Sequence, residues 1–363
     1  MESTRHLLRL RVTWAAAVLL ALSSSVVPGS VSGRPGPGVS PAPVVRLSRT
    51  PSAAIRDTSL QPLRLQQTPA GWHGGPMTAS TGEAVTVFVS DSYPPDQVTP
   101  QAWADFFAHL VHGNELSLVQ IYVAPLSEVQ AICGQYALAC YGASRLVIPG
   151  ETAGGNTAQD IATHEYGHHV AFNRPATPWA AIDWGTKRWA SYTNVCARVA
   201  QGTAFPGDEG ANYKLNPGEA FAEAYRVLNT TKDGTSVTWG LVDMSFLPDA
   251  TALGLVKRDV VDPWAASPPR TISGLFTPKG RTSSQFVLPT PLDGDLRVSL
   301  AMPTGGMYDL KLLTPGGKTL ASGLWSGQRA KALSFTICGQ RSVVLRVTRV
   351  GTPGRYAVKI TTP

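Results

Sequence analysis

The chain has 363 residues, enough for two domains, and its hydrophobic content of 43% is ordinary for a globular protein. Charged residues make up only 15%, while 35 glycines and 29 prolines indicate many turns and extended segments. The formal net charge is +7, but no run of Lys and Arg is interleaved with aromatic residues, which argues against a nucleic-acid-binding protein. Beyond the N-terminus no segment approaches the roughly 20 apolar residues of a membrane-spanning helix, so we expect no stable membrane insertion.

The N-terminal segment has the order of a secretory signal. Three arginines precede an apolar run over 14–22, which is followed by small residues up to Ser32. Residues 1–32 are therefore predicted to be a signal peptide and the protein to be secreted; an uncleaved anchor is the alternative. Residues 33–72 are rich in Pro, Gly and Ser, which predicts a linker or short pro-segment without a core of its own.

The next stretch, 73–262, mixes helix and strand signals, which predicts an α+β domain. The predicted elements are a strand over 84–90, a helix over 100–112 capped by Thr99, a strand over 116–123, a short helix over 127–132 and a strand over 140–149. The last strand is a candidate edge strand for pairing with an extended substrate, although an ordinary sheet strand is equally compatible. A further helix is predicted over about 184–200, in a segment whose tryptophans suit a core or a substrate cleft.

The sequence around residue 164 has the pattern H-E-x-x-H. His164 and His168 are four residues apart, so on a helix they lie on one face and can bind one metal ion, and Glu165 lies beside the open position of the metal as a general base. Asn156 or Thr157 can cap this helix, whose end is predicted near 173–175. The pattern indicates a zinc hydrolase.

The third ligand is expected from a later helix. The metzincin pattern would need Gly at 171 and His at 174, where this chain has Ala171 and Arg174. No histidine follows His169, which faces away from the first two, so a carboxylate is the natural candidate. A helix is predicted from Pro217 to about residue 228, with Glu219 and Glu223 on one face.

The two helices together resemble the gluzincin class of zinc metallopeptidases, on the segments HEYGH at 164–168 and EAFAEAYR at 219–226. The resemblance implies a zincin-like domain over 73–262, with His164, His168 and Glu219 as Zn²⁺ ligands and Glu223 as the acid that orients a ligand histidine. The reverse roles of the two glutamates stay open. The gap between His168 and Glu219 is longer than in thermolysin-like enzymes, and the later acid is Glu rather than Asp, so that subgroup is not implied.

Two further residues have candidate roles. Tyr213 precedes the ligand helix, where some gluzincins place a tyrosine that hydrogen-bonds the oxyanion; an ordinary loop tyrosine is the alternative. Asp160, one turn before His164, is either a partner of the site or an acid that favours the start of its helix.

The last part of the chain is predicted to be a small all-β sandwich over 273–363, joined by a linker over 263–272. Short alternating strands are predicted at 296–300, 307–313, 343–350 and 355–361. Their pattern and the ending GRYAVKI resemble the bacterial pre-peptidase C-terminal type of sandwich. A cell-envelope polymer is a candidate partner of this domain.

The chain has four cysteines, an even number that suits an oxidising compartment. Cys133 and Cys140 are close enough to close a small loop, and Cys196 with Cys338 is then the remaining pair, one of three possible connectivities. We therefore expect a secreted, monomeric zinc endopeptidase with Glu165 as general base, acting on peptide or protein substrates. The alternative is a secreted non-catalytic binding protein that keeps a zincin-like domain and uses its sandwich to bind carbohydrate or protein.

Overall fold

The computed structural model describes residues 71–94, 96–230, 238–326 and 331–363. The predicted signal peptide (residues 1–32) lies outside the described residues. So does the predicted linker or pro-segment over 33–72, except for its last two residues, 71 and 72. The described chain has an α+β fold, as the sequence predicts. Within it, no helix combines the length and apolar character needed to cross a membrane.

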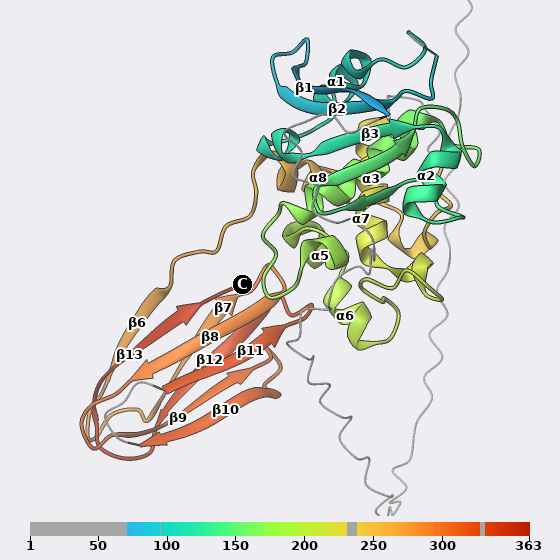
Figure 1. The fold of residues 1–363 in the computed structure, drawn as a ribbon. Coiled ribbons are helices and arrows are strands. Elements are labelled where there is room, and N and C mark those ends of the chain that lie inside the picture. The colour runs from blue at the N-terminus through green and yellow to red at the C-terminus, as the bar shows by residue number, and fades with distance from the viewer. Residues whose placement is uncertain (1–70, 95, 231–237, 327–330) are drawn as a thin grey trace, which may run out of the picture. The chain divides into compact units, whose positions relative to one another are not determined.

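The first part is built on a five-stranded mixed sheet (Figure 1). Its strands, in sheet order, are β1 (Trp72–Thr78), β2 (Ala84–Ser90), β3 (Gln120–Ala124), β5 (Arg145–Pro149) and β4 (Cys140–Gly142). Strands β2, β3 and β5 are parallel to one another, whereas the two edge strands, β1 and β4, run antiparallel to their neighbours. The predicted strand 84–90 is β2. Strand β1 was not predicted, because its Gly74, Gly75 and Pro76 are residue types that are rare in strands.

Helices cover both faces of this sheet. Helix α1 (Pro100–Ala108) and helix α3 (Ala158–Phe172) pack on one face, where Phe107 and Tyr166 join the large core cluster. Helix α2 (Leu126–Cys133) covers the other face through Val129. Thr99 caps α1 by accepting a hydrogen bond from the backbone of Ala102, and the helix is four residues shorter than predicted.

Two predicted strands are corrected by the structure. The segment 116–123 begins as a short 3-10 helix (Asn114–Leu118), and only β3 is extended. The segment 140–149 is a hairpin of β4 and β5, because Ala143 (φ 49°) and Ser144 (φ 64°) form a two-residue turn in the left-handed region. Such turns usually contain Asn-Gly or Asp-Gly, so this sequence carries no signal for the turn.

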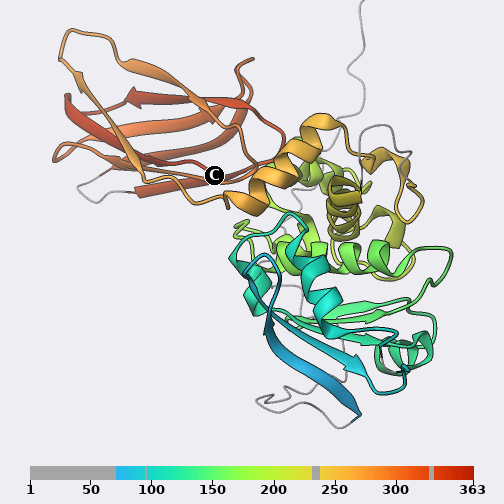
Figure 2. The same ribbon diagram turned by 90° about the horizontal axis from the view of Figure 1, so that it is seen from above.

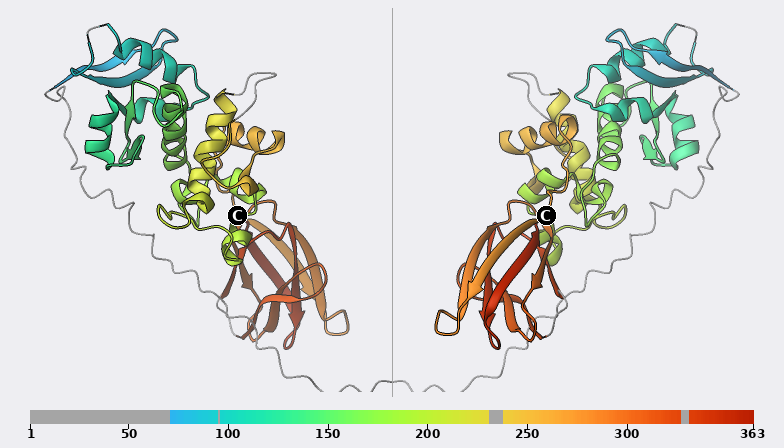
Figure 3. Two further views of the ribbon diagram at one scale, coloured as in Figure 1. Left: turned by 90° about the vertical axis from the view of Figure 1, so that its right-hand side faces the viewer. Right: turned by 90° about the vertical axis from the view of Figure 1, so that its left-hand side faces the viewer.

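A second group of helices follows α3. They are α4 (Ala181–Trp184), α5 (Lys187–Tyr192), α6 (Val195–Ala200), α7 (Pro217–Thr230) and α8 (Ala250–Val261). The stretch predicted to be helical over about 184–200 forms two helices, α5 and α6, because Gly185 (φ 77°) and Asn194 (φ 56°) take left-handed conformations that interrupt it. Helix α8 was not predicted. Helices α3 and α7 run side by side (Figure 3), and this pair carries the candidate site.

The C-terminal part consists of two four-stranded antiparallel sheets in two layers (Figure 2). One sheet has the order β10 (Thr319–Ser326), β9 (Met307–Leu313), β12 (Ser342–Arg349), β7 (Ser283–Pro289). The other has the order β11 (Lys331–Ile337), β8 (Gly294–Ala301), β13 (Gly354–Thr361), β6 (Arg270–Phe276). Residues of both sheets share one apolar core. Four strands, β8, β9, β12 and β13, were predicted; β6 begins within the predicted linker.

Both expected disulfides are formed. Cys133 bonds to Cys140 across the loop between α2 and β4, and Cys196 of α6 bonds to Cys338, which follows β11. The described residues contain no free cysteine.

Candidate metal centre

Helix α3 carries the two histidines, and its N-terminus is fixed by a capping residue. Thr157 caps it, accepting a hydrogen bond from the backbone nitrogen of Asp160 at 3.0 Å and donating its own hydroxyl to the Asp160 carboxylate at 2.7 Å. His164 and His168 therefore lie one turn apart on one face, with ring centroids 5.0 Å from each other. The helix ends at Phe172, close to the predicted position.

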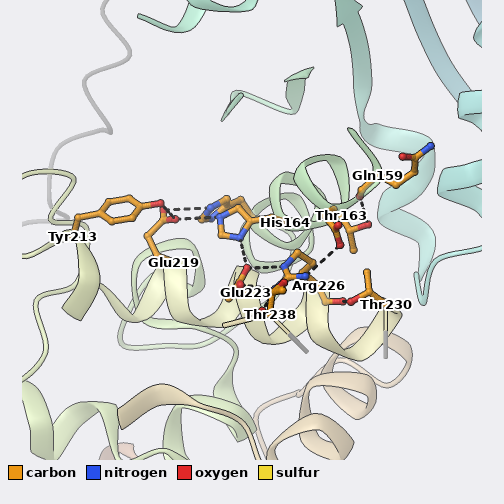
Figure 4. Close-up of polar contacts among 11 residues, drawn as sticks. Gln159, Thr163, His164, Tyr213, Glu219, Glu223, Arg226, Thr230 and Thr238 are labelled. Atoms are coloured by element: carbon orange, nitrogen blue, oxygen red, sulfur yellow. Dashed lines mark hydrogen bonds and ion pairs between the residues drawn. The ribbon is translucent and has the colours of Figure 1, made fainter. Parts of the chain in front are cut away.

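Helix α7 presents the two glutamates. Its start is held by buried Asn216, whose side-chain oxygen accepts hydrogen bonds from the backbone nitrogens of Gly218 (2.9 Å) and Gly207 (3.2 Å). Pro217 occupies the first turn, where a missing backbone N–H costs little. Glu219 and Glu223 follow one turn apart, both facing α3 (Figure 4).

Three of the predicted residues converge. The carboxylate of Glu219 lies between two imidazoles, with Oε2 3.2 Å from Nε2 of His164 and Oε1 3.3 Å from Nε2 of His168. One ligand atom from each residue lies within 4.8 Å of the other two, and all three side chains are buried. Two imidazole nitrogens and a carboxylate oxygen form a donor set that suits zinc, so the residues fit a metal ion.

The structure distinguishes the two glutamates by position. Glu223 does not join the cluster; its Oε2 lies 3.1 Å from Nδ1 of His164, on the far side of the imidazole from Glu219. Hydrogen bonding at Nδ1 fixes the ring orientation and leaves Nε2 free for a metal. This geometry favours Glu219 over Glu223 as a ligand.

Arg226 holds Glu223 in place. Its guanidinium donates to both carboxylate oxygens, at 2.9 Å and 2.7 Å, and to the backbone oxygen of Thr238 (Figure 4). It also donates to Asp160 at 3.2 Å. Burial favours the neutral form of Glu223, but hydrogen bonds from His164 and Arg226 outweigh it and lower the pKa to about 2. Asp160 thus has both roles that the sequence left open, since it sits in the first turn of α3 and contacts the residue behind the site.

The two candidate catalytic residues border the cluster. Glu165 is partly exposed, and in the described chain no hydrogen bond or ion pair occupies its carboxylate. Burial favours the neutral form of Glu165 and so raises its pKa, and the negative charge of Glu219 acts in the same direction. His168 and His164 act against this shift. Tyr213 begins a short 3-10 helix (Tyr213–Leu215) rather than lying in a loop, and its hydroxyl donates to Oε2 of Glu219 at 2.7 Å, so it lies within the site.

Several residues at the site have roles that the sequence did not predict. Glu209 accepts a hydrogen bond from Asn216 at 2.9 Å, and burial together with the charge of Glu219 raises its pKa to about 7. Gly167 allows the two helices to approach closely, because a Cβ at this position would stand 2.8 Å from Cα of Ala222. Nothing in the sequence marked Glu209 or Gly167 for these roles.

His169 does not take part in the cluster. Its Nε2 donates to the backbone oxygen of Glu115 at 2.8 Å, and its Nδ1 lies 3.1 Å from the hydroxyl of Tyr141. Among the tryptophans of the following segment, Trp189 is fully buried, and Trp179 stacks on Trp184. Trp189 therefore belongs to the core.

Comparisons with known proteins identify no family. No family model and no curated protein matches the chain. Among solved structures, the mitogen of Yersinia pseudotuberculosis covers 26% of this chain and 86% of its own, at 15% identity and a TM-score of 0.20. The SPBc2 prophage-derived protein YomS covers 27% of this chain and 98% of its own, at 14% identity and a TM-score of 0.18. A carbohydrate-binding module, CBM36, solved with calcium and xylotriose, covers 27% of this chain and 88% of its own, at 11% identity and a TM-score of 0.18. Likenesses this weak carry no functional inference.

Proposed function

We propose that this protein is a secreted zinc-dependent endopeptidase of the gluzincin type. The observation that carries the proposal is the convergence of His164, His168 and Glu219 on one point, with the unengaged carboxylate of Glu165 next to them. A bound cation would balance the buried carboxylate of Glu219 while leaving both imidazoles neutral, which supports a metal at this point. The H-E-x-x-H segment on a capped helix and the glutamate on a second helix are the features shared with gluzincins.

The proposed metal is zinc. The donor set would hold it through Nε2 of His164, Nε2 of His168 and a carboxylate oxygen of Glu219. When bound there, zinc supplies a Lewis acid for the substrate carbonyl and lowers the pKa of a coordinated water to about 7. Three protein ligands are the number found in catalytic rather than structural sites.

Other side chains of the site are proposed to transfer protons, stabilise the oxyanion and orient a ligand histidine. The Glu165 carboxylate accepts a proton from the attacking water and later transfers it to the leaving amine. The hydroxyl of Tyr213, which donates to Glu219 at 2.7 Å in this structure, is the proposed donor to the oxyanion that forms on the carbonyl. Glu223 and Arg226 hold the ring of His164 in the orientation that metal binding needs.

Secretion is supported by the two disulfides, which are typical of oxidising compartments, and by the charge and hydropathy order of residues 1–32. In such a compartment the substrate would be an extracellular peptide or protein.

The proposal is tested with Glu165→Gln, a substitution that keeps the size of the side chain and removes its basicity. We expect about one zinc ion per chain by elemental analysis, and cleavage of a peptide library that a chelator abolishes. Glu165→Gln should keep its zinc and its thermal unfolding temperature but lose about 10³-fold in kcat/KM. Asp96→Asn, which removes one exposed carboxylate outside the site, is the matched control and should retain full activity. Wild-type activity of Glu165→Gln, or no cleavage by the zinc-loaded wild-type protein, would refute the proposal; the second result would favour a binding protein.

A further inference from the structure

The net charge of the chain hides a strong difference between two parts of its sequence. Residues 71–262 contain ten Lys and Arg against nineteen Asp and Glu, a net charge of −9. Residues 263–363 contain thirteen Lys and Arg against three Asp, a net charge of +10. A domain of about a hundred residues with this excess attracts polyanions over a distance of about a Debye length.

One sheet of the sandwich presents part of this charge in an ordered way. On β9, Tyr308, Leu310 and Leu312 are buried in the core, so Asp309 and Lys311 between them point to the outer face of the sheet β10-β9-β12-β7. The same alternation on β12 places Arg346 on the outer face. This outer face is that of the sheet β10-β9-β12-β7 alone.

Four side chains on the outer face lie in one row across all four strands. Strand register pairs Ser322 with Lys311, Lys311 with Arg346, and Arg346 with Gln285. We call Ser322, Lys311, Arg346 and Gln285 the polar row. With strands about 4.8 Å apart, the row extends over about 14 Å, and each member can donate hydrogen bonds from its side chain.

The two cations of the polar row, Lys311 and Arg346, occupy its centre. Lys311 and Arg346 are directly opposite each other on neighbouring strands, a position in which like charges destabilise a sheet. Lys311 has Asp309 at 3.1 Å but remains 40% exposed. An anion that contacts both cations would remove the repulsion and pair each of them.

Exposed apolar side chains flank the polar row. Val287 of β7 is 70% exposed and Leu324 of β10 is 60% exposed, and each lies two residues along its strand from a member of the row. Aromatic stacking platforms, which single-stranded nucleic acids require, are not seen there, since Tyr308, Trp325 and Tyr356 are buried in the described sandwich core. Cations beside aliphatic surface suit a glycan, which offers both anionic groups and C–H faces.

We propose that the polar row binds a linear anionic glycan with phosphate or carboxylate groups along its length. Nε and Nη2 of Arg346 lie 3.1 Å from the side-chain amide oxygen of Gln285, so the guanidinium contacts either group through its remaining N–H donors. Lys311 supplies a second point charge one strand away. The remaining positive charge of the domain attracts the polymer electrostatically but does not contribute to its specific recognition. Such binding would hold the protein at a cell surface, and it does not depend on the peptidase activity proposed above.

The test measures binding of the full-length protein to phosphomannan and hyaluronate, which distinguish phosphate from carboxylate, with uncharged mannan as the neutral control. We expect binding to at least one anionic glycan, and a dissociation constant that rises about tenfold between 50 and 200 mM NaCl. Lys311→Gln with Arg346→Gln should weaken binding about tenfold. The matched control, Arg355→Gln with Lys359→Gln, removes two exposed cations from the outer face of the other sheet and should change binding less than about twofold.

Three results would overturn the proposal. They are equal binding of mannan, equal weakening by the two double variants, and tighter binding of DNA than of either anionic glycan. Peptide cleavage by the Lys311→Gln, Arg346→Gln variant should match the wild type, so a failure of the glycan proposal is distinguishable from a failure of the peptidase proposal. Its unfolding temperature should stay close to that of the wild type, because relief of the like-charge contact is offset by loss of the Lys311–Asp309 ion pair, and both are exposed, weak interactions.

Discussion

Gly167 in α3 lies directly against the backbone of Ala222 in α7, where a Cβ at 167 would come within 2.8 Å of Cα and 3.1 Å of the backbone oxygen. Small residues on both sides bring the two helix axes close together. That approach sets the distance between His164 and His168 on one helix and Glu219 on the other.

Gly167→Ala should therefore loosen the metal centre. Alanine favours a helix by about 1 kcal/mol relative to glycine, but here its methyl group has to push α7 away. We expect weaker zinc binding and a loss of about 1–3 kcal/mol in the free energy of unfolding, measured by zinc titration and denaturant unfolding. Gly254→Ala in α8 is the control, since a Cβ there meets nothing within 4 Å and should stabilise the protein. If both substitutions stabilise it equally, the close approach is unimportant.

The two glutamates of α7 should have different effects on metal affinity. Glu219→Gln removes a ligand atom and should abolish stable zinc binding. Glu223→Gln keeps all three ligands but weakens the support of His164, so zinc affinity should fall about 10–100-fold. Competition with a chromophoric chelator measures both. Loss of zinc only in Glu223→Gln would mean that the roles are reversed.

Tyr213→Phe tests the proposed oxyanion contact. The substitution removes only the hydroxyl that now donates to Glu219 at 2.7 Å. We expect kcat to fall about 10²-fold with KM and bound zinc nearly unchanged, because the hydroxyl acts when charge develops on the substrate. Tyr192→Phe, which removes a hydroxyl bonded to Asp249 on the protein surface, is the control. An unchanged kcat in Tyr213→Phe would make this residue a tyrosine without a catalytic role.

The buried Lys187 should make the free energy of unfolding depend on pH in the alkaline range. Its ammonium group is buried, donates to the backbone oxygen of Thr177 at 2.5 Å and lies 4.7 Å from the ring centroid of Trp264. Burial lowers its pKa from 10.5 to about 8. Between these values the unfolded chain binds more protons than the folded one, so this residue makes stability rise with pH, by up to about 3 kcal/mol.

Lys187→Met should remove this rise, and Lys257→Met, which changes an exposed lysine on α8, should keep it. Denaturant unfolding at pH 7.5, 9 and 10.5 measures the slope for each protein. Identical slopes in wild type and Lys187→Met would show that the buried ammonium does not control stability in this range.

The elements that the sequence predicted well are those with local signals. Strand β2, strand β9 and helix α3 have clear periodicity or a cap, and both disulfides follow from cysteine spacing and number. The elements that were missed lack such signals: β1 contains Gly-Gly-Pro, and the turn at Ala143 and Ser144 uses residues that rarely adopt positive φ. The helical stretch predicted over about 184–200 is divided into α5 and α6 because Asn194 adopts a left-handed conformation that composition does not reveal.

The sequence by itself determined that His164, Glu165 and His168 share a helix, and that Glu219 and Glu223 share another, because a spacing of four residues is a local property of the backbone. It left the two glutamates equivalent, since both lie on the same face of α7. Only the tertiary structure separates them: the packing of Gly167 on Ala222 fixes the position of α7 along α3, which places Glu219 between the two imidazoles and Glu223 behind one of them.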